Sequence, residues 1–237
     1  MQKFLVTLLA LCLPLLAWAD LPEPFMVRYN ASYGSLSAES WRSLSYDADN
    51  KHYVMQAQTR LTLLGGNLSS IDEHSEFLWN GTSAVPLHYR YEQKGLGARR
   101  RSADFDYANA TLSWSTDGKS GSLPLTDPVY DDLNSFMEIR RQLMQGRELI
   151  EFEVMDKNEV KPYRFQVLGK EMLDTPLGKY EAVHLERLRD PKSERVTEFW
   201  LASDMDYLLL KLRQIEPDGR LIELNAREIE RGEPSSS

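Results

Sequence analysis

Histidines and carboxylates are the residues of this sequence best suited to acid–base or metal chemistry, and one group of them alternates along a predicted strand. Residues at a spacing of two share one face of a strand, and a hairpin at Asn80-Gly81 would bring the next strand alongside. The polar residues that would then share a face are Asp72, His74, Glu76, His88, Arg90 and Glu92. Such a set could bind zinc or act as general acid and base. The same pattern is ordinary for a half-exposed strand, and we favour that interpretation.

No catalytic or cofactor motif is recognisable elsewhere in the sequence. The only cysteine, Cys12, lies in the apolar N-terminal segment, so a processed chain would have no thiol nucleophile and no cysteine metal ligand. The segment Gly118–Ser122 lacks the spacing of a serine-nucleophile turn and is interpreted as a flexible hairpin tip. We therefore assign no catalytic residue, no metal ligand and no cofactor, and we favour a protein that is not an enzyme.

A run of three arginines, Arg99-Arg100-Arg101, stands out in an acidic protein. Guanidinium groups could contact an anionic head group or an acidic glycan, although a run of like charge more often solvates a strand. Arg99 and Arg100 are therefore candidate ligand-binding residues. Most of the tryptophans should lie in the core, and a minority could line a cavity in a half-open barrel.

The N-terminus has the three zones of a cleavable secretory signal. Lys3 supplies a positive charge, residues 4–16 are almost entirely apolar, and Ala17-Trp18-Ala19 places small residues before Asp20. The apolar stretch is shorter than the roughly 20 residues that span a membrane. The sequence therefore predicts a signal peptide over residues 1–19 and a periplasmic protein.

The charge balance disfavours one class of partner. Removal of residues 1–19 takes away Lys3 and changes the net charge from −8 to −9. A surface of this sign repels the phosphate backbone, so we expect no nucleic-acid binding. No second apolar stretch approaches membrane-spanning length, and we expect no transmembrane segment in the processed chain.

Alternating β-rich segments between turn residues dominate the rest of the chain. The expected strands are 25–33, 36–46, 52–64, 70–79, 87–93, 99–107, 110–115, 149–155, 162–168, 180–189, 194–202, 207–215 and 221–228. Strands joined by tight turns pair antiparallel, and about a dozen of them rarely stay in one flat sheet. We predict a mainly β fold, with antiparallel curved sheet or sheets forming a partly open barrel or a sandwich.

One amphipathic helix is expected over residues 132–145, covering the sheet. Asp131 and Asp132 could cap it, Gly146 would end it, and its apolar face would pack on the sheet. That face consists of Leu133, Phe136, Met137 and Met144. The helix would lie in a single domain over residues 20–230, which could consist of two packed halves, 25–126 and 149–229, and residues 231–237 would form a flexible tail.

Several short motifs resemble a family of exported bacterial proteins known as the domain of unknown function DUF3108. The motifs are Tyr130-Asp131-Asp132-Leu133 with Arg140, the segment Thr175–Ala182, the segment Thr197–Leu201, and Asp218-Gly219. Their order and spacing carry the resemblance, which covers most of the processed chain. The resemblance implies exported, β-rich proteins and supplies no activity.

Two classes of function remain open. The first is a non-catalytic periplasmic protein that binds an amphipathic or hydrophobic ligand, such as a lipid or a glycan, or an envelope protein partner. Its site would lie in the concavity or mouth of the curved sheet near the helix, with Tyr130, Asp131 and Trp200 as candidate ligand-binding residues. The second is a hydrolase of glycans or esters that uses a carboxylate pair, such as Asp72 with Glu76 or Asp131 with Asp132. We favour the first.

Overall fold

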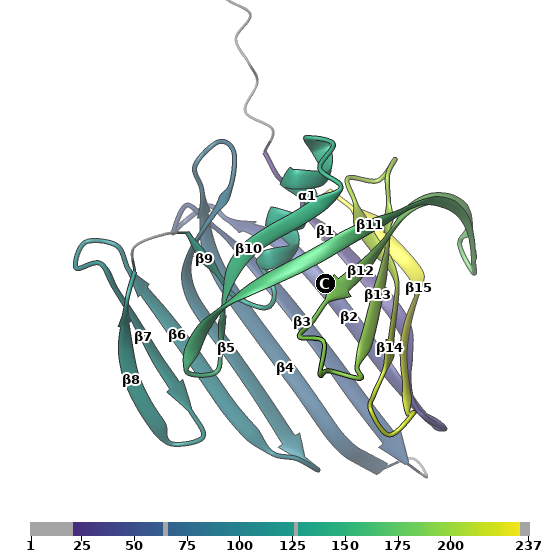
Figure 1. Cartoon of the computed structure of the whole chain (residues 1–237), viewed down its shortest axis with the longest axis horizontal. Coiled ribbons are helices and arrows are strands. Elements are labelled where there is room, and N and C mark those ends of the chain that lie inside the picture. The colour runs from purple at the N-terminus through teal and green to yellow at the C-terminus, as the bar shows by residue number, and fades with distance from the viewer. Residues whose placement is uncertain (1–20, 64–65, 126–127, 233–237) are drawn as a thin grey trace, which may run out of the picture.

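The computed structural model describes residues 21–63, 66–125 and 128–232. The signal peptide expected over residues 1–19, and residues 233–237 of the expected tail, lie outside these ranges. Within the described part, fifteen strands form one sheet that accompanies a single helix, α1 (Figure 1). The predicted mainly β architecture with one helix is confirmed.

The first eight strands pair in sequence order, each antiparallel to the next. Their bounds are β1 (Phe25–Tyr33), β2 (Leu36–Asp47), β3 (His52–Leu63), β4 (Gly66–Trp79), β5 (Ala84–Gly95), β6 (Arg99–Asp106), β7 (Thr111–Thr116) and β8 (Lys119–Pro124). Of the hairpin tip expected at Gly118–Ser122, only Gly118 lies in the turn between β7 and β8, and the expectation is wrong for Lys119–Ser122. The turn is at Asp117-Gly118, where φ is 49° and 82°, and most of the segment belongs to edge strand β8, whose small polar residues lack the apolar alternation of a strand.

The remaining strands flank or follow the helix. Their bounds are β9 (Val129–Tyr130), β10 (Leu149–Asp156), β11 (Glu159–Thr175), β12 (Gly178–Leu188), β13 (Val196–Ala202), β14 (Leu208–Ile215) and β15 (Leu221–Arg231). Strands β10 to β15 again pair antiparallel in sequence order. The two-residue strand β9 is the exception, because it pairs parallel with β10. Its length explains why the sequence pattern did not reveal it.

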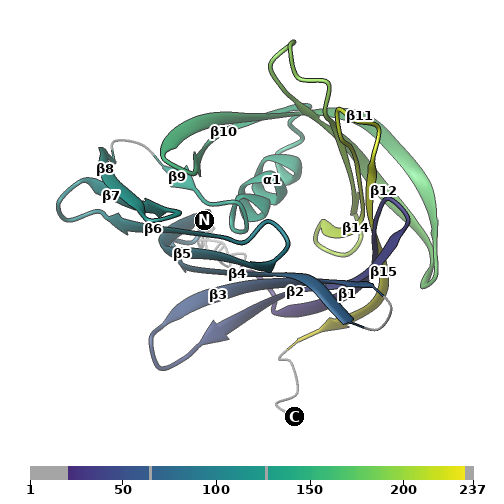
Figure 2. The ribbon, with the colours of Figure 1, turned by 90° about the horizontal axis from the view of Figure 1, so that it is seen from below.

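Pairing between the first and last strands joins both halves of the chain into one sheet. Strand β1 pairs with β15 as well as with β2, so the order runs from β8 through β1 and β15 to β9. Strands β8 and β9 stand at the two ends of this order and are not paired with each other. The sheet is therefore curled but not closed into a barrel, and it wraps around α1 (Figure 2).

Helix α1 (Ser135–Met144) lies on the concave face of the sheet, which we define as the face toward this helix. It begins three residues later than expected, because the Asp131 carboxylate accepts the backbone N–H groups of Leu133 and Asn134 and forms a turn ahead of the helix. The helix is buried on nearly all sides. Its buried residues are Ser135, Met137, Glu138, Ile139, Arg140, Gln142 and Leu143. The expectation that Met144 packs on the sheet is wrong: it is the last helical residue and 51% exposed.

The apolar core lies between α1 and the concave face. Phe136 of α1 meets Phe199 of β13 edge-on, with ring centroids 5.9 Å apart, and Phe165 of β11 lies 5.7 Å from Phe199. Side chains with almost no exposed surface come from both halves of the sheet, including Val27, Tyr29, Leu44, Met55, Phe77, Leu112, Ile150 and Leu185.

No helix in the described part of the chain is long and apolar enough to cross a membrane.

Candidate functional site

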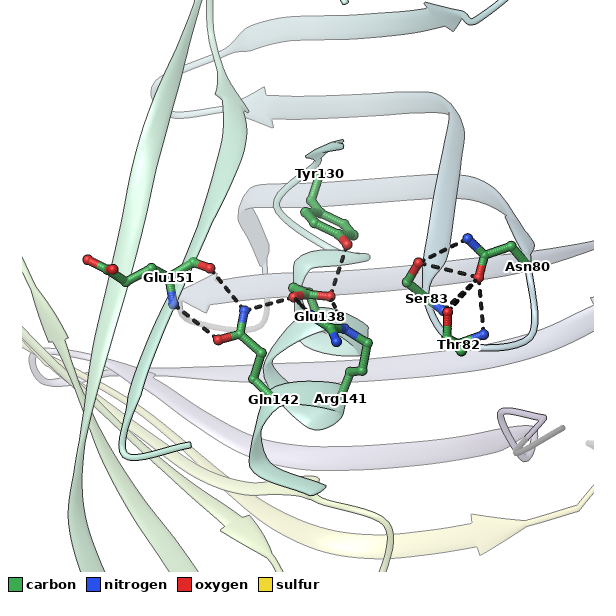
Figure 3. A network of polar contacts seen from close by, with 8 residues as sticks. All are labelled: Asn80, Thr82, Ser83, Tyr130, Glu138, Arg141, Gln142 and Glu151. Atoms are coloured by element: carbon green, nitrogen blue, oxygen red, sulfur yellow. Dashed lines mark hydrogen bonds and ion pairs between the residues drawn. The ribbon is translucent and has the colours of Figure 1, made fainter. Parts of the chain in front are cut away.

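Tyr130 lies in β9 and is buried against the helix. Its hydroxyl donates a hydrogen bond to Oε2 of Glu138 at 2.9 Å, as Figure 3 shows. Arg141 donates to both oxygens of the same carboxylate at 2.6 and 2.7 Å, and Gln142 Nε2 donates to it at 2.7 Å. Burial and the neighbouring Glu138 raise the pKa of Tyr130. The hydroxyl therefore serves to join β9 to α1, and a part in ligand binding stays a prediction.

Asp131 is completely buried beside the first turn of the helix. Its carboxylate accepts four hydrogen bonds: from the Ser75 hydroxyl and the Asn134 side-chain amide, both at 2.6 Å, and from the backbone N–H groups of Leu133 and Asn134, both at 2.9 Å. Burial raises the pKa of Asp131 to about 7, although the hydrogen bond from Ser75 lowers it. Asp131 thus connects the turn before α1 to β4, and its predicted part in ligand binding also stays a prediction.

Trp200 lies on the convex face of β13, away from the helix. Its neighbour Phe199 contacts α1, and successive side chains of a strand point to opposite faces. The Trp200 ring stacks on His184 with centroids 4.3 Å apart, Lys211 Nζ lies 4.9 Å from the ring centroid, and the indole N–H donates to Glu171. The structure therefore places Trp200 on the opposite side of the sheet from Tyr130 and Asp131.

The arginine run of β6 is divided between the two faces of the sheet. Arg100 is on the convex face, where its guanidinium forms an ion pair with Glu92 at 2.7 Å. Arg99 is on the concave face, where its Nε donates to Gln93 Oε1 at 2.8 Å. Arg101 shares the concave face with Arg99, and its guanidinium lies 5.0 Å from the ring centroid of Tyr91.

The alternating histidines and carboxylates lie on the convex face of β4 and β5. His74 Nε2 is 2.8 Å from Glu76 Oε1, and His88 Nδ1 is 2.5 Å from Asp104 Oδ1. Asp72 accepts a hydrogen bond from Gln58 at 2.5 Å. Within the described ranges, no three histidine, cysteine or carboxylate side chains are grouped closely enough to hold a metal ion.

A row of residues across six neighbouring strands brings charged side chains onto the concave face. Each residue is the register partner of the next, from β2 to β7, and residues directly opposite one another share a face. We call this set the charged row: Arg42, Ala57, Glu73, Tyr91, Arg101 and Thr116. The Arg42 guanidinium lies 4.1 Å from the ring centroid of Phe136 in α1, which fixes the orientation of the row toward the helix.

The charged row meets polar side chains from the turn before α1 and from the other half of the sheet. Asp132 accepts a hydrogen bond from Tyr163 of β11 at 3.2 Å, and Arg187 of β12 stacks over the Tyr163 ring at 3.5 Å from its centroid. Burial and the charge of Asp156 raise the pKa of Asp132, whereas Arg101 and Arg187 lower it. Arg101 of one wall and Arg187 of the other therefore act on the same carboxylate.

Glu73 is the carboxylate at the centre of the charged row. It accepts a hydrogen bond from the Tyr89 hydroxyl at 2.7 Å. Burial raises the pKa of Glu73 and the charge of Asp132 raises it further, whereas Arg42 and Arg101 lower it. The charge of Asp132 thus disfavours the ionisation of Glu73, and Arg101 acts on both carboxylates.

The interior arginines hold N–H groups that have no acceptor. Buried nitrogens without a hydrogen-bond partner among the described residues include Nη1 of Arg42, Nε of Arg101 and Nε of Arg189. Arg189 directly follows β12, and Thr197 accepts one of its other N–H groups at 3.0 Å. Burial and the neighbouring cations Arg187 and Arg195 lower the pKa of Arg189 to about 10. An unsatisfied buried donor is costly, and more so on a charged group.

Half-buried aliphatic side chains occupy another row of the concave face. They are register partners across β14, β15, β1, β2 and β3, and we call them the aliphatic row: Leu212, Leu224, Ala31, Ala38 and Leu61. Leu212 is opposite Phe199, which contacts α1, so this row faces the concave side. On β2, Ala38 is four residues from Arg42, a separation of about 13 Å along the strand.

The space directly beneath the helix is small. A cavity of about 30 Å³ lies between α1 and the sheet, beside Arg42, Tyr29 and Met137. That volume holds about two water molecules, whereas pockets for organic ligands have roughly 300–1,000 Å³. Two larger hollows are both polar. One, of about 480 Å³, lies beside Arg140 and Asp206, and the other, of about 520 Å³, lies on the convex face beside Arg60. A ligand of the predicted kind would therefore have to bind to the concave face outside this small cavity.

The charged row was not predicted from the sequence, although the sequence carries one signal of it. In β4 the residues that share a face with Glu73 include the apolar Ile71 and Phe77, so a carboxylate interrupts an otherwise core-facing pattern. Arg42 interrupts β2 in the same way, two residues before the buried Leu44. A charged residue at a core-facing position is unusual unless it is paired or functional.

Comparison with solved structures supports the fold. The chain resembles a β-barrel-like protein of the domain of unknown function DUF1849 from Brucella abortus, with a TM-score of 0.59 at 10% identity, over 88% of this chain and 98% of that one. Two weaker likenesses are a protein with a YmcC-like fold from Bacteroides fragilis (TM-score 0.38, 11% identity, 88% and 96% covered) and a porin-like protein from Bacteroides uniformis (TM-score 0.34, 8% identity, 87% and 96% covered).

Comparison by sequence gives the family. No curated protein matches the chain significantly. A family model described as "Protein of unknown function (DUF3108)" matches residues 28–225, which include the motifs that carry the resemblance. The chain belongs to the DUF3108 family.

Proposed function

We propose that this protein is exported to the periplasm and binds an amphipathic ligand, without converting it, on the concave face of its curled sheet. The observation that carries the proposal is the presence, on one face, of arginine N–H groups without acceptors and of a half-buried aliphatic row. A polar group of the ligand would lie at the charged row and its apolar part along the aliphatic row. Ligand sites commonly combine an apolar lining with a few polar groups that fix orientation.

The pattern of residues 1–19 supports the periplasmic location. A short apolar stretch after Lys3 and small residues at positions 17 and 19 are typical of a cleaved secretory signal. A protein in the periplasm is surrounded by lipids, glycans and envelope proteins. An amphipathic ligand is therefore available where the protein would work, and an envelope protein is the other occupant that the sequence left open.

The arrangement of carboxylates favours binding over hydrolysis. Asp72 and Glu76 lie on the convex face, where they contact Gln58 and His74. The Asp131 carboxylate already accepts four hydrogen bonds, from Ser75, Leu133 and Asn134. Asp132 is hydrogen-bonded to Tyr163. In neither pair, Asp72 with Glu76 or Asp131 with Asp132, do both carboxylates face one substrate on the concave face, as general acid and base catalysis requires.

A pair of adjacent substitutions tests the proposed site. Ala38 is half-buried on the concave face, and its neighbour Ser37 is exposed on the convex face. Protein purified from its own periplasm, examined by native mass spectrometry, should retain a small amphipathic molecule. Ala38→Trp fills the aliphatic row and should abolish retention, whereas Ser37→Trp should leave it unchanged. Equal unfolding midpoints for the two variants would show that both remain folded.

Three results would contradict the proposal. Retention by Ala38→Trp equal to that of the unmodified protein would remove the aliphatic row from the site. A retained protein partner in place of a small molecule would favour the envelope-partner alternative. Turnover of ester or glycoside substrates, lost in Asp132→Asn, would establish the hydrolase.

A further inference from the structure

We propose that the charged row and the arginines facing it recognise an oxyanion of the phosphate type, carried by the ligand as its head group. This inference rests on the proposed function and specifies the chemistry of the same site. It is carried by the unpaired N–H groups, by the excess of cations over carboxylates on this part of the concave face, and by the arrangement of the arginines on two walls.

The unpaired N–H groups define what the ligand must supply. Each of the three buried nitrogens, on Arg42, Arg101 and Arg189, is a donor, so only hydrogen-bond acceptors can satisfy them. Guanidinium groups bind carboxylate and phosphate oxygens through paired, charge-assisted hydrogen bonds, which are stronger than neutral ones. A neutral hydroxyl group would satisfy a donor but would leave the buried positive charge uncompensated.

The local charge balance requires an anion. Four arginines lie on this part of the concave face: Arg42 and Arg101 act on Glu73, Arg101 and Arg187 act on Asp132, and Arg189 lies beside Arg187. The other nearby carboxylates, Asp156 and Glu216, are ion-paired with Lys161 and Arg195. None of these four arginines forms an ion pair with a residue in the described part of the chain. Burial raises the pKa of both carboxylates, which reduces their capacity to compensate the arginines. An added anion would restore the balance and would relieve the repulsion between Arg187 and Arg189.

The positions of the arginines favour a tetrahedral oxyanion over a planar one. Arg42 and Arg101 come from β2 and β6, whereas Arg187 belongs to β12 and Arg189 directly follows β12, in the other half of the sheet. Donors that approach from two walls require acceptors in more than one plane. A phosphate offers three or four oxygens in such an arrangement, and a carboxylate offers two in one plane.

Two neighbouring arginines supply a matched test. Arg101 is on the concave face with an unpaired Nε, and Arg100 is on the convex face in an ion pair with Glu92. Isothermal titration calorimetry on the delipidated mature protein would compare dodecyl phosphate, dodecyl glucoside and inorganic phosphate, with the detergents below their critical micelle concentrations. Dodecyl phosphate should bind most tightly. Arg101→Gln should weaken it by at least about tenfold, while Arg100→Gln should leave it unchanged.

The three probes separate failure of this inference from failure of the proposed function. Equal affinities for dodecyl phosphate and dodecyl glucoside, unaffected by Arg101→Gln, would overturn the inference and leave amphipathic binding intact. Binding of neither detergent would overturn both. Inorganic phosphate bound as tightly as dodecyl phosphate, and weakened by Arg101→Gln, would support oxyanion recognition and identify the free ion as its source. If Arg101→Gln is unfolded by circular dichroism, Arg187→Gln replaces it and should show the same tenfold loss.

Discussion

The position of α1 inside the curled sheet can be tested by truncating one residue of the helix. Ile139 is 1% exposed, near the middle of α1, and Met144 is 51% exposed at its end. Because the sheet surrounds the helix, Ile139→Ala should be strongly destabilising. Met144→Ala serves as the matched control, since it truncates a side chain of the same helix that faces solvent.

The expected loss follows from the burial of the side chain. Replacing Ile139 by alanine removes three buried carbon atoms, worth about 2.4 kcal/mol at roughly 0.8 kcal/mol for each. The cavity that remains adds to this cost and brings the total into the range of about 2–5 kcal/mol found for such truncations. Truncation of Met144 should change the free energy of unfolding by no more than about 0.5 kcal/mol.

Urea unfolding of the mature protein, followed by circular dichroism, would measure both effects. With an m-value of about 3 kcal/mol/M, a loss of 3 kcal/mol lowers the midpoint by about 1 M. The m-value itself should not change, because both variants unfold to the same chain. Equal midpoints for Ile139→Ala and Met144→Ala would refute the arrangement in which the sheet encloses the helix.

Three further predictions concern separate parts of the chain. Burial raises the pKa of Asp131 from 3.8 to about 7, so between pH 4 and 7 the folded protein holds a proton that the unfolded chain releases. The free energy of unfolding should therefore fall by about 1.4 kcal/mol per pH unit in this range, relative to that of Asp131→Asn. Parallel pH profiles for the two proteins would contradict this. Gly95 has a φ of 77°, and a Cβ at this position would collide with the backbone of Leu68. Gly118 has a φ of 82° but open space around it, so Gly118→Ala costs only the roughly 1–2 kcal/mol strain of the left-handed region. Gly95→Ala should therefore destabilise the protein at least twice as much as Gly118→Ala. N-terminal sequencing of the periplasmic protein should begin at Asp20, and a chain that retains Met1 would show that the signal is not cleaved.

The sequence by itself predicted most of the strands and the single helix, because both depend on local periodicity. The alternation of Tyr53 and Met55 in β3, for example, is visible within a few residues, and both side chains are buried. The elements that were missed had no such signal. Strand β8 consists largely of small polar residues, and β9 has only two residues.

The faces on which the candidate residues lie were only partly predictable. Alternation correctly placed Asp72, His74 and Glu76 together, but it could not say whether that face is concave or convex. The same limit applies to Trp200, whose outward position depends on the contact of Phe199 with the helix. Neither face of a strand is marked as inner until the sheet has curled.

Only the tertiary structure decided that Arg42, Glu73 and Arg101 form one row. Their alignment depends on the register of successive strand pairs, and a shift of one residue in any pair would move the following side chains to the other face. The approach of Arg187 to Asp132, on which Arg101 also acts, depends further on the pairing of β1 with β15, which brings the two halves of the chain together. The register of the strands and the pairing of β1 with β15 arise from contacts between residues far apart in the sequence, and local patterns do not contain them.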